Sequence, residues 1–238
     1  MIWWITATLA AFFIKGLCGF ANTLVFTTIL SFGNDNVNIS PIELILGYPA
    51  NVIMAWKERK SIKPGICVPL SAMVIIGGIP GALFLKNADT GIIKLIFGFI
   101  IILIALELLV RELKPVKLKP SRALFVIVGI LSGVLCGLFG IGALIGAYVG
   151  RITEDTRAFK ANISIVFFVE NTFRIILYSI WDIINIDILG RSLTLMPLML
   201  IGLAGGIICG RVINDRLAKH IVIIMLIVSG AALVINNI

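Results

Sequence analysis

Long stretches without any charged residue constrain the fold of this chain more than any other feature. One covers the 28 residues 123–150, and three others, 16–34, 65–85 and 192–210, are 19 to 21 residues long. An α-helix needs roughly 20 apolar residues to cross a bilayer. The stretches do not alternate between apolar and polar residues, which excludes membrane β-strands. With 60% hydrophobic and 13% charged residues, the chain is predicted to be an all-α polytopic membrane protein.

The net charge of +8 does not indicate a nucleic-acid partner. The Lys and Arg residues lie in short connectors between apolar stretches, where the cytoplasmic loops of membrane proteins are basic. The first apolar stretch has no basic residue before it and no cleavage-site pattern, so we expect it to be retained as a span. We expect a multi-pass protein of the cell (plasma) membrane, with the lipid bilayer as its surroundings.

Cysteine and histidine usage predicts no metal site, no cofactor and no disulfide scaffold. The four cysteines lie within apolar stretches and show no CxxC spacing. His220 is the single histidine, and one histidine cannot make a metal site.

Short motifs recur at a nearly constant separation along the chain. The separation is 118 for Leu-Cys-Gly at 17–19 and 135–137, 120 for Asn51 and Asn171, and 125 for Gly81 and Gly206. Such recurrence indicates a duplication. The predicted organisation is a first transmembrane repeat at 1–113, a linker rich in Pro and Lys at 114–121, and a second transmembrane repeat at 122–238.

Each repeat is expected to contain a long Gly-rich segment followed by three ordinary spans. The eight hydrophobic segments are 2–33, 40–56, 65–85, 92–110, 122–150, 159–180, 189–210 and 220–237.

Basic residues in the connectors predict how these segments cross. If every segment crosses once, ten basic residues fall on one side and eight on the other. If 2–33 and 122–150 each return to the side that they left, the split becomes fifteen against three. The positive-inside rule favours the second arrangement. The two repeats would then have inverted topology.

The length of the second Gly-rich segment agrees with a re-entrant hairpin. Its 28 uncharged residues would form a helix about 42 Å long, against a hydrocarbon core of about 30 Å. Its glycines offer places to turn, and two hairpins would give up to ten helices. The alternative is a long tilted helix whose glycines allow close packing.

The segments GILSGVLCGLFGIG (129–142) and KGLCGFAN (15–22), with the small-residue motifs GGIPGA (77–82) and GLAGG (202–206), resemble the TauE/SafE family of sulfite and sulfonate exporters. The resemblance extends over essentially the whole chain. It departs at 20–22 and at Ala143, where more glycine is usual. The resemblance implies transport of sulfite or another sulfur-containing or organic anion.

Broken helices within a membrane are a place where a transporter keeps its site. Freed N–H groups and the positive ends of helix dipoles favour an anion, and glycine lets it approach the backbone. Lys15 is the candidate for a full positive charge, although it could instead extend to the interface. The other candidate substrate-binding residues beside the turns are Cys18, Asn22, Cys136, Gly140 and Gly142. The two cysteines could instead be small buried apolar residues.

Glu170 and Arg174 are four residues apart on one helical face and can pair. Counting from Lys160 at about 1.5 Å per residue places Glu170 about 15 Å deep. Glu170 could carry a proton coupled to anion movement, and Arg174 could hold Glu170 or bind the substrate. A purely structural ion pair is also compatible with the spacing.

Asn51 and Asn171 are candidate substrate-binding residues because the repeat places both at mid-depth. Their amides could donate to an oxyanion or only to a neighbouring helix. Glu43, beside Pro41, is interpreted as a carboxylate at the N-terminus of the second span.

We therefore expect a secondary transporter or facilitator of a small anion, with a site between the two repeats and possible proton coupling. The sequence shows no P-loop or soluble ATP-hydrolysing domain, so we do not expect the chain to drive pumping by itself. The alternatives are a membrane-embedded enzyme, which lacks a recognisable catalytic motif, and an assembly or scaffold subunit without transport. The sequence predicts no particular oligomeric state.

Overall fold

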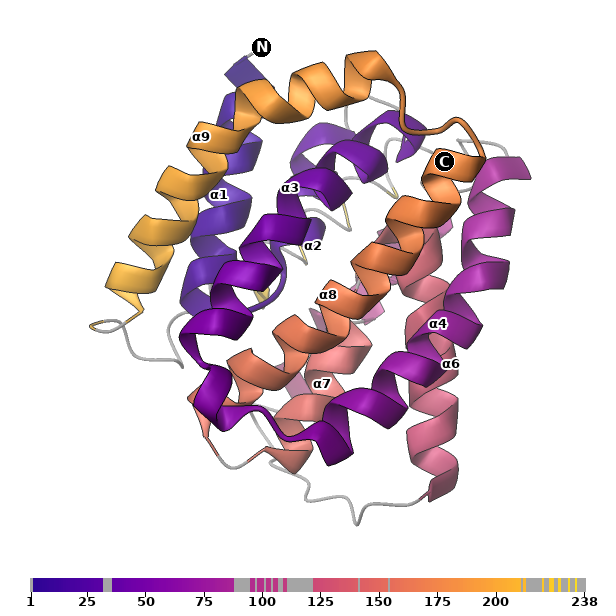
Figure 1. The fold of residues 1–238 in the computed structure, drawn as a ribbon, viewed down its shortest axis with the longest axis vertical. Coiled ribbons are helices and arrows are strands. Elements are labelled where there is room, and N and C mark those ends of the chain that lie inside the picture. Colours follow the sequence, from indigo (N-terminus) through magenta and orange to yellow (C-terminus); the bar gives the residue numbers. More distant parts are fainter. Residues whose placement is uncertain are drawn as a thin grey trace.

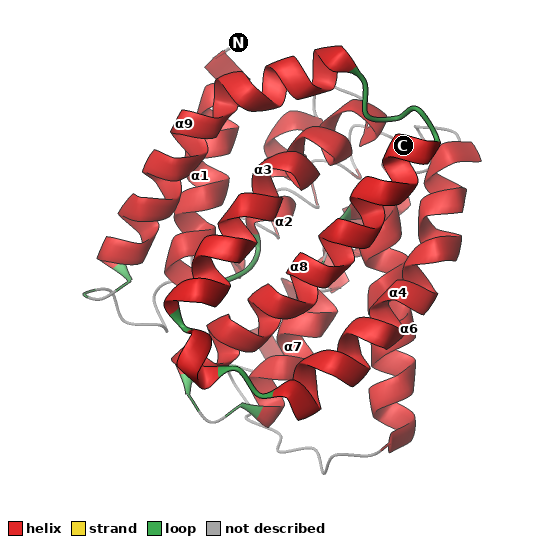
Figure 2. Ribbon diagram, viewed as in Figure 1, coloured by secondary structure: helices red, strands yellow, loops and turns green. Residues whose placement is uncertain are grey.

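The structure, a computed structural model, describes residues 2–31, 36–87, 122–140, 142–153 and 155–210, with scattered residues between 95 and 110 and between 212 and 234. The described residues form helices joined by short loops and contain no strand (Figure 2). The expected linker 114–121 lies outside the described residues, as do part of the expected span 92–110 and most of the expected span 220–237.

The first Gly-rich segment is two helices, α1 (Ile2–Cys18) and α2 (Asn22–Ser31). Gly19 (φ 88°) and Ala21 (φ 70°) adopt left-handed backbone between them. The rings of Trp4 and Phe26 are 5.9 Å apart, whereas one continuous helix would separate these residues by about 33 Å. The chain therefore reverses direction at the break.

The second Gly-rich segment is divided in the same way, into α6 (Arg122–Phe139) and α7 (Ala143–Ile152). Gly140 between them has φ 70°, a conformation that glycine adopts without steric cost. The rings of Phe125 and Tyr148 are 5.6 Å apart, so this segment also folds back. Neither Gly-rich segment is one long tilted helix.

Four longer helices lie in the other continuously described ranges: α3 (Asn36–Lys57), α4 (Pro64–Asn87), α8 (Thr156–Ile180) and α9 (Ile186–Cys209), with the short 3₁₀ helix η1 (Arg59–Ser61) after α3. Side-chain caps start two of them, because Asp155 accepts from the N–H of Ala158 (2.6 Å) and Asn185 from that of Ile188 (2.9 Å).

Each of the four longer helices contains a stretch long and apolar enough to cross a membrane: Ile39–Lys57, Pro64–Phe84, Thr156–Ile180 and Ile186–Cys209. Apolar side chains such as Val68, Leu193 and Ile201 are exposed on their outer faces, as lipid contact requires. The prediction of an all-α, multi-pass membrane protein is confirmed.

Close helix crossings join the two halves of the chain. Figure 1 shows α1 beside α9 on one side of the molecule and α4 beside α6 on the other, with α3 and α8 between these pairs. A Cβ atom at Gly206 would overlap the carbonyl oxygen of Phe13, and one at Gly137 would overlap that of Gly78. Glycine is thus required where these backbones meet.

The inner helices carry the two hairpins. Helix α2 contacts α3, α7 contacts α8, and α3 packs along α8. Hydroxyl groups of Ser40 and Tyr178 lie 3.3 Å apart across this central pair. The breaks in both Gly-rich segments consequently face the same central region.

Candidate functional site

Four charged side chains among the described residues are buried in this central region. Lys15 is 1% exposed, Glu43 2%, Glu170 4% and Arg174 2%. They come from α1, α3 and α8. Charges buried within a membrane protein need partners and mark functional positions. With all four ionised, the two cations balance the two carboxylates.

Lys15 belongs to a hydrogen-bonded chain that spans the first break. Its Nζ donates to Oδ1 of Asn22 (3.0 Å), and Nδ2 of Asn22 donates to Oε1 of Glu43 (2.5 Å). The hydroxyl of Thr23 donates to the same oxygen of Glu43 (2.8 Å). Three helices are tied together here, so the ammonium group does not extend to the membrane interface.

Arg174 makes contacts with three elements. Its Nη1 donates to the backbone oxygen of Cys136 (2.6 Å), at the end of α6. Its Nη2 lies 3.7 Å from Oε2 of Glu43 and its Nε lies 3.6 Å from Oε1 of Glu170. The pairing with Glu170 follows the four-residue spacing in α8. The planar guanidinium group suits several simultaneous partners better than an ammonium group would.

The carbonyl ends of both broken helices are matched by cations from α8. Lys160 donates to the backbone oxygen of Leu17 (2.7 Å), near the end of α1, as Arg174 does to that of Cys136 in α6. Cations at helix C-termini offset the negative end of the helix dipole. The N-termini of α2 and α7, which carry the positive ends, begin directly beyond the breaks.

A small cavity lies where these N-termini meet. The cavity volume is about 20 Å³, which leaves room for roughly one water. The described residues that line it are Lys15, Ala21, Asn22, Thr23, Leu24, Glu43, Asn51, Gly140, Gly142, Phe167 and Asn171. Both breaks, α1, α3 and α8 therefore contribute to one space.

Most sequence-predicted site residues come together around this cavity. Lys15, Asn22, Asn51, Gly140, Gly142 and Asn171 line it. Arg174 and Glu170 lie in the adjoining ion-pair network. Cys136 provides its backbone oxygen to Arg174. Cys18 is half-buried and is not among the described lining residues.

Five lining residues were not predicted as part of the site: Ala21, Thr23, Leu24, Glu43 and Phe167. The interpretation of Glu43 as a residue at a helix N-terminus is wrong, because α3 begins at Asn36 and Glu43 lies seven residues further on. The sequence did carry a signal for Glu43, because a carboxylate one full turn inside an apolar span marks a candidate functional residue. Thr23 and Phe167 resemble the many other Thr and Phe residues of the spans.

Apolar spanning helices, two broken segments and a buried charged centre between them are typical of one class of protein, the polytopic membrane transporters. The family model described as "Sulfite exporter TauE/SafE" matches residues 4–233. The chain belongs to this family, as the sequence motifs indicated. The family consists of transporters of sulfur-containing anions and not of enzymes. Searches of curated proteins and of solved structures gave no match.

Proposed function

We propose that this protein is a secondary transporter or facilitator of a small sulfur-containing oxyanion, such as sulfite or an organosulfonate, and that the central cavity is its binding site. The observation that carries the proposal is the position of Lys15, whose buried ammonium group lines the cavity at the break between α1 and α2. Both helices that start at the cavity present their positive ends to it.

Backbone donors support an anion at this position. Gly142, the residue before α7, gives no side-chain cap, and the first N–H groups of a helix have no partner within that helix. The glycines at 140 and 142 place no side chain of their own beside these groups. An oxyanion can therefore contact the backbone on one side and Lys15 on the other.

Asn51 supports an occupant with hydrogen-bonding capacity. Its side chain lines the cavity and is buried, and its Oδ1 has no hydrogen-bond partner among the described residues. A buried acceptor without a partner is unfavourable. A water or the hydroxyl of a protonated oxyanion in the cavity would supply the missing donor.

The two carboxylates give a basis for proton coupling. Glu43 and Glu170 neutralise Lys15 and Arg174, so an incoming anion competes with them for the cations. A proton on either carboxylate removes one negative charge and leaves a net positive site. Anion and proton would then enter together, and acid outside should drive uptake into proteoliposomes.

Glu170→Gln should transport the anion without responding to the pH gradient. A full response in that variant would exclude Glu170 as the proton carrier.

The proposal includes two inverted repeats and a location in the cell membrane. The basic connectors and the crossed packing of α1 with α9 and of α4 with α6 support the inverted arrangement. The hairpins would then enter from opposite sides and meet at the cavity, as in other transporters with inverted repeats.

Binding can be measured on the purified protein in detergent. A bound anion should raise the unfolding temperature in a saturable manner, with sulfite and methanesulfonate effective and choline ineffective. Lys15→Met should fold but lose this response. A scaffold protein would fold with either lysine or methionine at position 15 and would show no anion response. That result for the wild type would contradict the proposal.

A further inference from the structure

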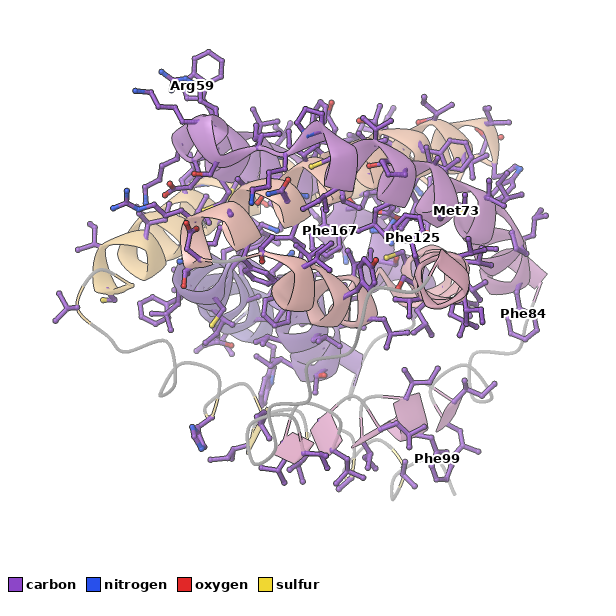
Figure 3. All side chains as sticks on the ribbon, turned by 90° about the horizontal axis from the view of Figure 1, so that it is seen from below. Arg59, Met73, Phe84, Phe99, Phe125 and Phe167 are labelled. Carbon is purple, nitrogen blue, oxygen red and sulfur yellow. The ribbon has the colours of Figure 1, made fainter. Side chains whose placement is uncertain are left out.

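Phe167 is the only aromatic residue among the described residues that line the cavity. Its side chain comes from α8 into the interior of the molecule, whereas labelled residues such as Arg59 and Phe84 lie at the periphery (Figure 3). The ammonium nitrogen of Lys15 is 5.7 Å from the centre of its ring, a distance at which a cation is attracted to an aromatic face. The ring therefore covers the charge that the proposed anion needs.

The ring also lies against the second break. A Cβ atom added to Gly142 would overlap ring carbons Cε1 and Cζ of Phe167. Gly142 has φ −100°, which any residue can adopt, so the position requires glycine for space and not for backbone conformation. Gly142 provides the surface against which the ring rests.

The corresponding position on α3 carries no side chain. Phe167 precedes Asn171 by four residues, and Gly47 precedes Asn51 by four. A Cβ atom at Gly47 would lie 3.2 Å from Oε1 of Glu43 and 3.5 Å from Nδ2 of Asn171. On the α3 side the cavity is lined by the polar side chains of Glu43 and Asn51, whereas on the α8 side the ring of Phe167 lines it beside Asn171.

The ring and the cavity volume set a limit on the occupant. With the ring in place there is room for roughly one water, which is less than sulfite needs. The ring borders the cavity between Lys15 and Gly142, so turning it away from Gly142 would enlarge this space while the hydrogen bonds of Lys15, Asn22 and Glu43 remain.

We propose that Phe167 is the residue that determines which anions fit, acting as a movable plug between Lys15 and Gly142. This inference rests on the proposed function. The space released when the ring turns admits a small oxyanion but not one with a longer alkyl chain. A smaller residue at 167 should extend the substrate range towards larger organosulfonates.

The test compares uptake of sulfite, methanesulfonate and propanesulfonate into proteoliposomes containing wild type, Phe167→Leu or Phe167→Ala. The ratio of propanesulfonate to sulfite uptake should rise about tenfold in Phe167→Ala, the size of effect expected when one or two methylene groups are accommodated, and less in Phe167→Leu. Phe168→Ala is the matched control. Phe168 is the next residue of α8 and packs on Tyr48 (ring centres 5.1 Å apart), so its removal should leave the ratio unchanged.

Gly142→Ala gives a second, independent measurement. The added methyl group displaces the ring without removing it, so the preference for sulfite should weaken in the same direction. An unchanged ratio in folded Phe167→Leu and Gly142→Ala would overturn the inference, and so would an equal change in Phe168→Ala. If wild type moves none of the three anions above empty liposomes, the proposed function itself fails and the inference with it.

Discussion

The ammonium nitrogen of Lys15 lies 3.0 Å from the amide oxygen of Asn22, across the break between α1 and α2. Lys15 is in the last turn of α1 and Asn22 is the first residue of α2. The buried ammonium group of Lys15 is therefore held at the positive end of the next helix. The ammonium group of Lys15 and the N-terminus of α2 both favour an anion, and the hydrogen bond between Lys15 and Asn22 joins them.

Replacing Lys15 by methionine should reduce anion affinity by at least about tenfold, because a hydrogen bond to a charged group contributes roughly 1.5–3 kcal/mol. Lys15→Arg should retain part of the affinity. Anion-dependent thermal stabilisation of the purified variants measures both effects. Lys57→Met is the matched control, since Lys57 lies at the end of α3 with a more exposed side chain. Equal losses in both variants would remove Lys15 from the site.

Arg174→Gln should destabilise the protein by roughly 3–5 kcal/mol, the cost of leaving a buried charge without its partner. The substitution leaves the Glu170 carboxylate without its cation and the Cys136 carbonyl without its guanidinium donor. The double variant Arg174→Gln with Glu170→Gln should recover part of the loss, because it removes one unbalanced carboxylate. Denaturant unfolding in detergent compares the two, and a double variant less stable than the single one would contradict this account of the network.

Gly206→Ala should destabilise the protein by about 1–3 kcal/mol, because overpacking forces the neighbouring backbone to move. The new methyl group would meet the carbonyl oxygen of Phe13 and separate α9 from α1. Gly190→Ala, on the same helix, meets nothing within 4 Å. It should leave stability unchanged or raise it by up to about 1 kcal/mol through helix propensity. Equal unfolding temperatures for the two variants would show that this crossing does not need glycine.

Single cysteines distinguish inverted repeats from segments that all cross once. In a background without the native cysteines, Lys60→Cys and Arg151→Cys should react with an impermeant maleimide from the same, cytoplasmic side, and Asp187→Cys from the other. If every segment crossed once, positions 60 and 151 would react from opposite sides. Labelling of 60 together with 187, but not with 151, would contradict the inverted arrangement.

The membrane fold could be predicted from sequence because apolar length depends only on local composition. The stretches 65–85 and 189–210 correspond closely to α4 and α9. The breaks could also be predicted from sequence, since glycines such as Gly19 and Gly140 mark positions where a long helix can end.

The connections within the site could be predicted only in part. Lys15 and Arg174 stand out because charge within an apolar span is rare. The contact of Lys160 with Leu17 joins residues 143 positions apart, and no local pattern indicates it. The role of Glu43 depends on where α3 begins and on the return of α2, and both follow from tertiary packing.

Flux into proteoliposomes tests the central claim most directly. Protein reconstituted at defined density, with empty liposomes and Lys15→Met as controls, is given labelled sulfite, methanesulfonate or rubidium. The account predicts saturable uptake of the sulfur oxyanions by wild type alone and no uptake of rubidium. Uptake confined to the cation, or anion uptake that Lys15→Met retains in full, would contradict it.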